Sequence, residues 1–232
     1  MIKFIKIILI LSLITIMISG CSEEREDPVY TSNITASYDG FDFELWSQYE
    51  DEVSMTLTGG GTFQCEWNDA FNVLFRMGKK TGSINNYREY GDIIIEYGAE
   101  HKITRGDVSY LCIYGWTENP LIEFYVIENH GRYRPPGNGE LIGRIEVDGG
   151  TYDVYKDIRT EQPSIQGTQT FEQYFSVRTQ RRTEGTVSLH EHFKAWEELG
   201  LDMSGTLYEF ALCVEGYNGS GSADVYKHII HK

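Results

Sequence analysis

Short runs in which apolar and polar residues alternate, separated by turn-forming clusters, constrain the fold of this 232-residue chain more than any other feature. Alternation with a period of two is typical of β-strands that bury one face. The clusters TGGG, PPGNG and VDGG supply residues that tight turns favour. Runs of strand length are SYLCIYGW, PLIEFYVIEN, TYDVYKDIR, TFEQYFSVR, YEFALCVEGY and SADVYKHII. So many strands in one domain predict an all-β fold of two packed sheets.

One segment near the C-terminus departs from the strand pattern. The tetrapeptide SLHE, which begins at Ser188, has the form of a helix capping box, and apolar residues follow it at helical spacing. The pattern predicts a single helix over residues 189–199 whose aromatic stripe packs on a sheet. His190 and His192 lie near its start, and we expect both to be exposed and neither to be a metal ligand.

The N-terminus has the pattern of an export signal. Residues 1–20 contain two lysines, then an apolar run, then small residues before Cys21. The tetrapeptide ISGC resembles a bacterial lipobox, which implies lipidation of Cys21 and a membrane-anchored cell-surface lipoprotein. An ordinary secretory signal followed by a chance cysteine is the alternative, and it implies a secreted protein. Residues 21–37 are polar and predict a linker, whereas 38–232 are sufficient for one domain with a sizeable core.

The charge balance excludes some classes of partner. The chain has a formal charge of −15, and removal of residues 1–20 would make it −17. Such acidity argues against nucleic acid and against attraction to anionic lipid, so contact with a membrane would depend on the anchor alone. A neutral polysaccharide is compatible with this charge.

The cysteines other than Cys21 predict no metal site. The spacing of Cys65, Cys112 and Cys213 matches no known ligand pattern, and three thiols allow at most one disulfide. Small buried core residues are an equally good interpretation. The sequence leaves open whether Cys112 and Cys213 pair.

The run PLIEFYVIEN carries two glutamates on opposite faces of its predicted strand. Strand alternation puts Glu123 and Tyr125 on one face and Glu128 on the other. A buried glutamate needs a partner, whereas one in a groove is available for chemistry. Periodicity alone does not distinguish these cases, and a strand glutamate is usually just solvated. We interpret Glu128 as structural.

Longer motifs connect these residues to a known family. The stretch DVSYLCIYGWTENPLIEFYVIENHG resembles the Y-x-x-Y-G-W-T-x-N-P-L-I-E-Y-Y-V-x-E segment of family 11 glycoside hydrolases, the small jelly-roll xylanases. CVEGYNGSGSADV resembles the second glutamate motif of that family, and QPSIQGTQTFEQYFSVR resembles its thumb hairpin. GFDFELW and GTFQCEWNDAFNVLFRMGKK follow the order of the family, whereas residues 79–106 match it only loosely. The resemblance covers nearly the whole domain.

The resemblance implies a fold, a reaction and a set of site residues. The fold is a β-jelly roll sandwich of two twisted antiparallel sheets with one packed α-helix and a substrate cleft crossed by the thumb. The reaction is endo-hydrolysis of β-1,4-xylosidic bonds with retention, with Glu123 as nucleophile and Glu215 as general acid/base. Two carboxylates about 5–5.5 Å apart suffice for it, without cofactor or metal. Substrate-binding residues by the same resemblance are Trp46, Asn72, Tyr114, Tyr125, Arg159, Pro163, Ser164, Ile165 and Gln173.

Two further expectations follow from the resemblance. Asparagine at position 72, where other members have aspartate, implies activity near neutral pH. No residue of YEFALC can be matched securely to the family's cleft tyrosine, so Tyr208 is not assigned to the site. We expect a monomer acting on xylan or arabinoxylan. A β-1,4-glucanase on the same fold and a non-catalytic, glycan-binding surface lipoprotein are the alternatives.

Overall fold

A computed structural model describes residues 26–49 and 51–231 of the chain. The predicted signal peptide and the predicted lipidation site at Cys21 lie outside the described residues. Within them, no helix has the length and apolar character that crossing a membrane requires. The elements are β1 (Val29–Tyr30), β2 (Ile34–Tyr38), β3 (Phe41–Ser47), β4 (Glu52–Gly59), β5 (Thr62–Lys80), a 3₁₀ turn η1 (Tyr87–Glu89), β6 (Ile94–Arg105), β7 (Val108–Glu118), β8 (Ile122–His130), β9 (Glu140–Val147), β10 (Gly150–Ser164), β11 (Gly167–Arg178), β12 (Glu184–Ser188), α1 (Leu189–Glu198) and β13 (Thr206–His231).

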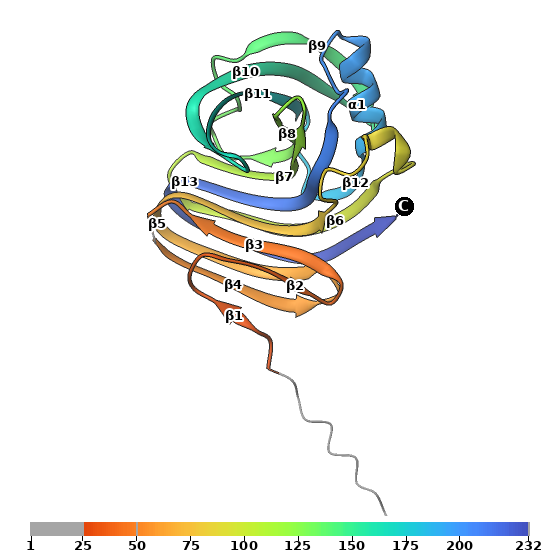
Figure 1. Cartoon of the computed structure of the whole chain (residues 1–232). Coiled ribbons are helices and arrows are strands. Elements are labelled where there is room, and N and C mark those ends of the chain that lie inside the picture. Colours follow the sequence, from red (N-terminus) through yellow and green to blue (C-terminus); the bar gives the residue numbers. More distant parts are fainter. Residues whose placement is uncertain (1–25, 50, 232) are drawn as a thin grey trace, which may run out of the picture.

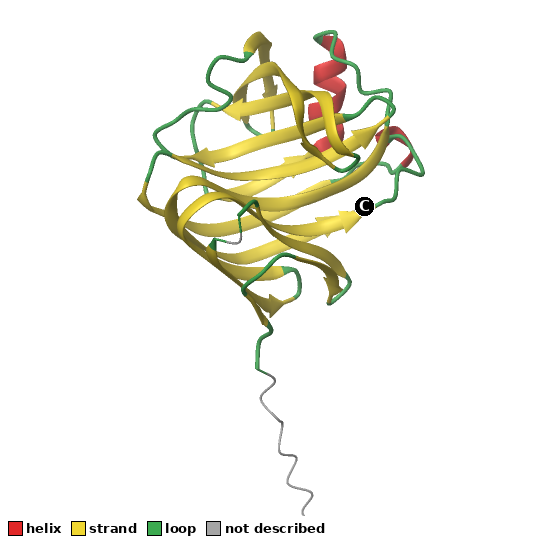
Figure 2. Cartoon of the chain, turned by 60° about the vertical axis from the view of Figure 1, so that its left-hand side comes forward, coloured by secondary structure: helices red, strands yellow, loops and turns green. Residues whose placement is uncertain are grey.

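The strands form two layers that share their longest members (Figures 1 and 2). The main strand order is β1-β4-β5-β13-β7-β8-β11-β10-β9; β2 and β3 extend from β5, and β6 and β12 extend from β13. The first half of β13 pairs with β7 and its second half with β6, so one hydrogen-bonded sheet folds over on itself. The predicted all-β jelly roll with one packed helix is confirmed. Among the strands that the structure describes, all pairs are antiparallel except β8 and β11, which run parallel.

The point at which β13 changes partner requires glycine. The register of β13 against β5 shifts between Gly219 and Gly221, as expected of a β-bulge that bends a strand. A Cβ atom on Gly221 would lie 2.4 Å from the ring of Trp67 and 2.5 Å from the carbonyl oxygen of Lys102. Only glycine permits this approach, which gives the glycines of the NGSGS segment a structural role.

The ordered sheet begins before the predicted domain boundary at residue 38. Strand β1 and all of β2 except Tyr38 lie within residues 21–37, which the composition predicts to be a linker. The ring of Tyr30 packs 5.1 Å from that of Phe43, and Ile34 is half-buried against the core. The rest of the sheet therefore supplies the apolar surface that this polar segment lacks.

Helix α1 has the predicted position and packs on the sheet as expected. The backbone N–H of Glu191 donates to the side chain of the N-cap Ser188 at 3.4 Å. The ring of Phe193 packs edge-on against Phe124 at 4.9 Å. Phe124 belongs to the face of β8 opposite Glu123, so α1 covers the side of this strand that turns away from the proposed cleft.

The predicted exposure of His192 is wrong. The side chain is fully buried, and its ring nitrogens lie 2.9 Å from Ser176 Oγ and 3.2 Å from Asp148 Oδ2. His192 follows Leu189 by three positions and precedes Trp196 by four, which puts it on the apolar face of the helix. Two polar partners in the sheet satisfy the ring there. His190 is half-buried against Tyr87.

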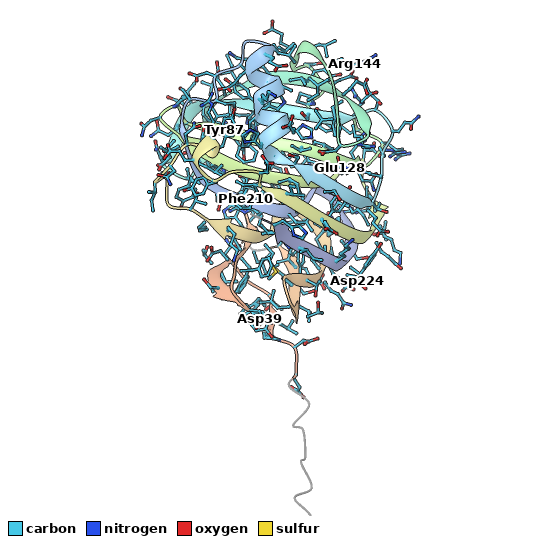
Figure 3. The ribbon with its side chains drawn as sticks, turned by 90° about the vertical axis from the view of Figure 1, so that its right-hand side faces the viewer. Asp39, Tyr87, Glu128, Arg144, Phe210 and Asp224 are labelled. Atoms are coloured by element: carbon cyan, nitrogen blue, oxygen red, sulfur yellow. The ribbon has the colours of Figure 1, made fainter. Side chains whose placement is uncertain are left out.

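Glu128 is buried in the interior, on the opposite face of β8 from Glu123, as the alternation predicts. Its carboxylate is 1% exposed and accepts hydrogen bonds from the hydroxyls of Tyr97 and Tyr152, each at 2.5 Å. The guanidinium of Arg182 completes the set of donors. Figure 3 shows Glu128 on the side of the molecule that carries α1. The carboxylate joins β8 to β6, β10 and the segment before β12.

Replacing Glu128 with alanine is expected to destabilise the protein by about 3 kcal/mol, because two buried hydroxyls and a guanidinium would lose their acceptor. For a domain of this size that is roughly a 6–12 °C fall in the thermal unfolding midpoint. Glu100, which is exposed and paired with Lys102, is the matched control, and Glu100→Ala should leave the midpoint nearly unchanged. Equal midpoints for the two variants would contradict a stabilising role for Glu128.

Candidate active site

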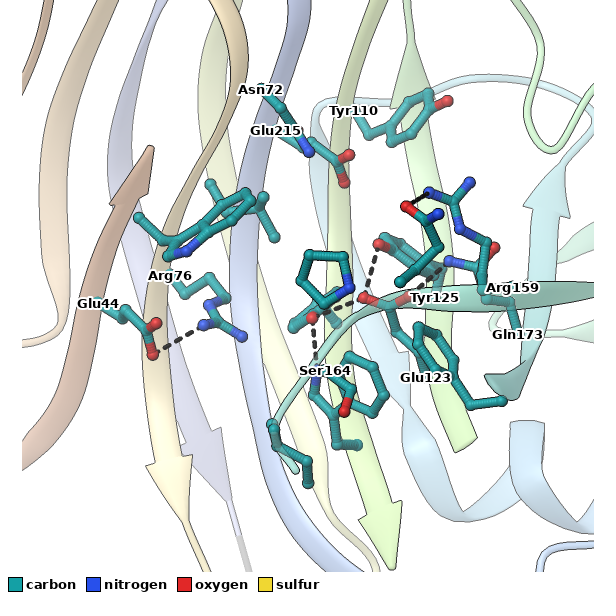
Figure 4. A pocket seen from close by; sticks show the side chains of 18 of the residues that line it. Glu44, Asn72, Arg76, Tyr110, Glu123, Tyr125, Arg159, Ser164, Gln173 and Glu215 are labelled. Atoms are coloured by element: carbon teal, nitrogen blue, oxygen red, sulfur yellow. Dashed lines mark hydrogen bonds and ion pairs between the residues drawn. The ribbon is translucent and has the colours of Figure 1, made fainter. Parts of the chain in front are cut away.

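A cavity of about 640 Å³ lies on the concave face of the folded sheet (Figure 4). Its walls come from β3, β5, β13, β7 and β8, and the hairpin of β10 and β11 lies over it. All eleven residues assigned to catalysis or substrate binding from the resemblance line this cavity: Trp46, Asn72, Tyr114, Glu123, Tyr125, Arg159, Pro163, Ser164, Ile165, Gln173 and Glu215. Residues up to 169 positions apart in the sequence therefore meet at one site.

Glu123 is held in the cavity by three donors. Its side chain is largely buried, with 8% of the residue exposed. The hydroxyls of Tyr114 and Tyr125 donate to its Oε1 at 2.7 and 3.2 Å. The amide of Gln173 donates to its Oε2. Gln173 is the direct partner of Glu123 in the parallel pair of β8 and β11, so the unpredicted parallel pairing is what brings this amide to the carboxylate.

Glu215 enters the cavity from β13, which β7 separates from the strand that carries Glu123. Its cross-strand neighbours are Leu74 on β5 and Tyr110 on β7. Glu215 Oε2 and Asn72 Oδ1 are buried, and neither has a hydrogen-bond partner among the described residues. Figure 4 shows the Asn72 side chain beside that of Glu215. The two carboxyl groups thus have different surroundings, with donors around Glu123 and few around Glu215.

These surroundings shift the pKa values of the two carboxyl groups to different extents. Burial raises the pKa of Glu123, and the hydrogen bonds from Gln173, Tyr114 and Tyr125 oppose that rise. Burial and the negative charge of Glu123 together raise the pKa of Glu215 to about 8. Near neutral pH the arrangement therefore favours one ionised carboxylate and one protonated carboxyl group in the same cavity.

The thumb-like hairpin is formed by β10 and β11, as the motif predicts. Ser164 pairs with Gly167 at its tip, and Ile165 and Gln166 form the turn. The amide of Gln166 donates to Glu118 at the end of β7 at 2.7 Å. This contact connects the tip of the hairpin to the sheet beneath it, so the hairpin lies over the cavity.

Comparison with known proteins agrees with this geometry. The model of glycosyl hydrolases family 11 matches residues 38–226. The chain belongs to family 11. An endo-1,4-beta-xylanase A of Thermoclostridium stercorarium is 52% identical over 198 residues, which are 85% of this chain and 30% of that protein. The endo-1,4-beta-xylanase A of Bacillus pumilus is 49% identical over 195 residues, 84% of this chain and 83% of that one.

A solved structure of a relative has the same fold. The family 11 xylanase from Neocallimastix patriciarum superposes with a TM-score of 0.80 at 36% identity, covering 88% of this chain and 99% of the other. The chain spans only about a third of the length of the first curated relatives that it matches, at 30%, 35% and 38%.

The family 11 cavity also contains a charged group that was not predicted from the sequence. The guanidinium of Arg76 bonds to Glu44 at 2.7 Å and to Glu209 at 2.8 Å, and Lys80 lies 3.4 Å from Glu44. Arg76 also lies 4.9 Å from the ring centre of Tyr114. Strand spacing could have found part of this group, because Arg76 is four positions from Asn72 and Glu209 is six from Glu215, which puts each on the cavity face.

Other cavity residues in this family 11 domain were also missed. Tyr208, which the resemblance did not place securely, lines the cavity, as do Tyr110, Trp116 and Phe171. The indole of Trp116 donates to the hydroxyl of Tyr114 at 2.5 Å and so helps to fix one of the donors to Glu123. Tyr110 and Trp116 stand at even spacing from Tyr114 on β7, a signal that alternation already contained.

The cysteines of the domain are small core residues. Cys65, Cys112 and Cys213 are free thiols and buried. Cys112 and Cys213 are direct partners on β7 and β13, with Cys112 Sγ 3.8 Å from the carbonyl oxygen of Cys213. The pairing that the sequence left open is therefore a contact between neighbouring thiols and not a disulfide.

Proposed function

We propose that this protein is an endo-β-1,4-xylanase that cleaves xylan with retention of configuration. The observation that carries the proposal is the pair of carboxyl groups in one cavity, with Glu123 surrounded by donors and the pKa of Glu215 raised to about 8. Relatives 49–52% identical over most of this chain are named as endo-1,4-beta-xylanases, which supports the choice of xylan.

In the proposed mechanism Glu123 is the nucleophile and Glu215 the general acid/base. The Glu123 carboxylate attacks the anomeric carbon while Glu215 gives its proton to the departing glycosidic oxygen. The first half-reaction leaves a glycosyl ester on Glu123 and an ionised Glu215. Glu215 then takes a proton from water, whose oxygen displaces the ester and restores both groups. The donors from Tyr114, Tyr125 and Gln173 hold the nucleophile in position between these steps.

The substrate-binding roles proposed from the resemblance fit the positions of the remaining residues. Trp46 offers an aromatic face in the cavity wall, which suits the apolar face of a xylose ring. Arg159, at the base of the thumb, lies close enough to lower the pKa of both glutamates through its charge. We propose that the thumb residues Pro163, Ser164 and Ile165 cover the bound chain from above.

Activity is expected to follow a bell-shaped pH profile with its alkaline limb near pH 8. Above the pKa of Glu215 the acid is ionised and cannot protonate the leaving oxygen, so the rate falls as pH rises. On the acidic side, protonation of Glu123, whose pKa is also raised, removes the nucleophile. The measurement is kcat/KM across pH for the wild type. An alkaline limb that persists unshifted in Glu215→Gln would contradict this assignment.

The test of the proposed function is release of reducing sugar by the purified protein from arabinoxylan and from carboxymethylcellulose at neutral pH. Xylo-oligosaccharides from arabinoxylan alone are expected. Release from carboxymethylcellulose alone would replace the proposal with a β-1,4-glucanase. Binding to either polymer without release would indicate a glycan-binding protein.

We also propose that residues 1–20 direct export and that Cys21 carries the lipid of a cell-surface lipoprotein. The support is the run of lysines, apolar residues and small residues before the cysteine. Expression in a bacterium with a lipoprotein pathway should put the wild type in the membrane fraction and Cys21→Ser in the medium or periplasm. Equal membrane association of both would overturn the lipid anchor.

A further inference from the structure

A row of three aromatic rings leads out of the cavity on the side of Asn72. Tyr217 lines the cavity and follows Glu215 by two positions on the same face of β13. The ring of Phe71 lies 5.2 Å from that of Tyr217, and the ring of Tyr49 lies 5.0 Å from that of Phe71. Neither Phe71 nor Tyr49 lines the cavity itself. The row is therefore continuous with the cavity at one end and reaches the surface at the other.

The turn that carries Tyr49 is fixed to the neighbouring strand. The backbone N–H of Phe71 donates to Asp51 Oδ2 at 3.0 Å, and the hydroxyl of Ser47 donates to the same oxygen at 3.0 Å. The backbone N–H of Gln48 donates to the carbonyl oxygen of Asn72 at 3.0 Å. These bonds attach both ends of the turn to β5, so the Tyr49 ring is held beside Phe71 before any ligand arrives.

The exposure of the outermost ring indicates a binding role. Tyr49 is 65% exposed, although its ring lies 5.0 Å from that of Phe71. Aromatic rings of this kind combine a large apolar face with little conformational entropy to lose, and are suited to flat, partly apolar ligands such as pyranose rings. The polar groups around the turn include Asp51 and Glu52, so an uncharged ligand fits this surface better than an anionic one.

We propose that Tyr217, Phe71 and Tyr49 form an additional sugar-binding subsite, which holds the same xylan chain after it leaves the cavity. The assignment of xylan as the ligand depends on the proposed function. The subsite lies on the side of the cavity away from the charged group of Arg76, Glu44 and Glu209. It lengthens the stretch of polymer that the protein contacts beyond the sugars bound between the two glutamates.

The test compares Tyr49→Ala with Tyr226→Ala. Tyr226 is an exposed tyrosine of similar accessibility, 53%, and it does not line the cavity. On polymeric xylan Tyr49→Ala should lower kcat/KM about three- to tenfold, mainly through KM, because one stacking contact is lost. On an aryl xylobioside, which ends within the cavity, both variants should match the wild type.

A binding measurement makes the test independent of turnover. In a Glu123→Ala background, Tyr49→Ala should weaken binding of long xylo-oligosaccharides about three- to tenfold and leave binding of xylobiose unchanged. Equal values for Tyr49→Ala and Tyr226→Ala on polymer and long oligosaccharide would overturn the subsite while the proposed function stood. Failure of the wild type to cleave xylan would instead contradict the proposed function. The comparison of binding affinities between the two tyrosine variants would still test the subsite.

Discussion

Replacing Glu123 with alanine is expected to abolish turnover of xylan and to leave the fold intact. The change removes the carboxylate that attacks the anomeric carbon, and loss of a nucleophile costs on the order of three to five powers of ten in rate. The fold should survive because Glu123 lines a cavity, where water can reach the donors it leaves behind. The measurements are the initial rate on arabinoxylan and the thermal unfolding midpoint.

The exposed Glu100 provides the control, since Glu100→Ala removes a carboxylate from β6 far from the cavity lining and should retain the wild-type rate. A small anion such as azide adds a sharper test. In Glu123→Ala it can enter the vacated space and attack an activated aryl xyloside from that side, giving a product of inverted configuration. More than about a tenth of the wild-type rate without azide would refute the nucleophile role.

Local pattern predicted which residues of β8 share a face, but not which face carries the chemistry. Alternation alone separates Glu123 and Tyr125 from Glu128, and the structure puts the first two in the cavity and the third among interior tyrosines. Whether the face that carries Glu123 and Tyr125 was a groove or a core depended on what covered it. That is a property of strands distant in the sequence, so only the resemblance to a family supplied the answer.

Contacts between distant strands account for most of what the sequence did not predict. The parallel pairing of β8 and β11, which delivers Gln173 to Glu123, involves strands some 50 residues apart and has no local signature. The ion pair of Arg76 and Glu209 joins residues 133 positions apart. The burial of His192 depended on Ser176 and Asp148 being available as partners, which composition cannot reveal.

Replacing Glu215 with glutamine is expected to slow cleavage according to the leaving group. An amide of nearly the same shape cannot give up a proton, so departure of a sugar alcohol from xylan loses its acid catalyst. The expected loss on xylan is about two to four powers of ten. An aryl xyloside with an acidic phenol needs little protonation, so its first half-reaction should slow far less. The measurement is the ratio of the two rates in the variant and in the wild type.

The two glutamate variants together distinguish the roles of the residues. If Glu123 were the acid and Glu215 the nucleophile, Glu123→Ala would retain the aryl xyloside reaction and Glu215→Gln would lose it. The surroundings oppose that exchange, because three donors favour the ionised form of Glu123, whereas the charge of Glu123 disfavours ionisation of Glu215. Azide added to a Glu215→Ala variant should yield a product of retained configuration, since Glu123 still forms the ester that the anion displaces. An inverted product from that variant would reverse the assignment.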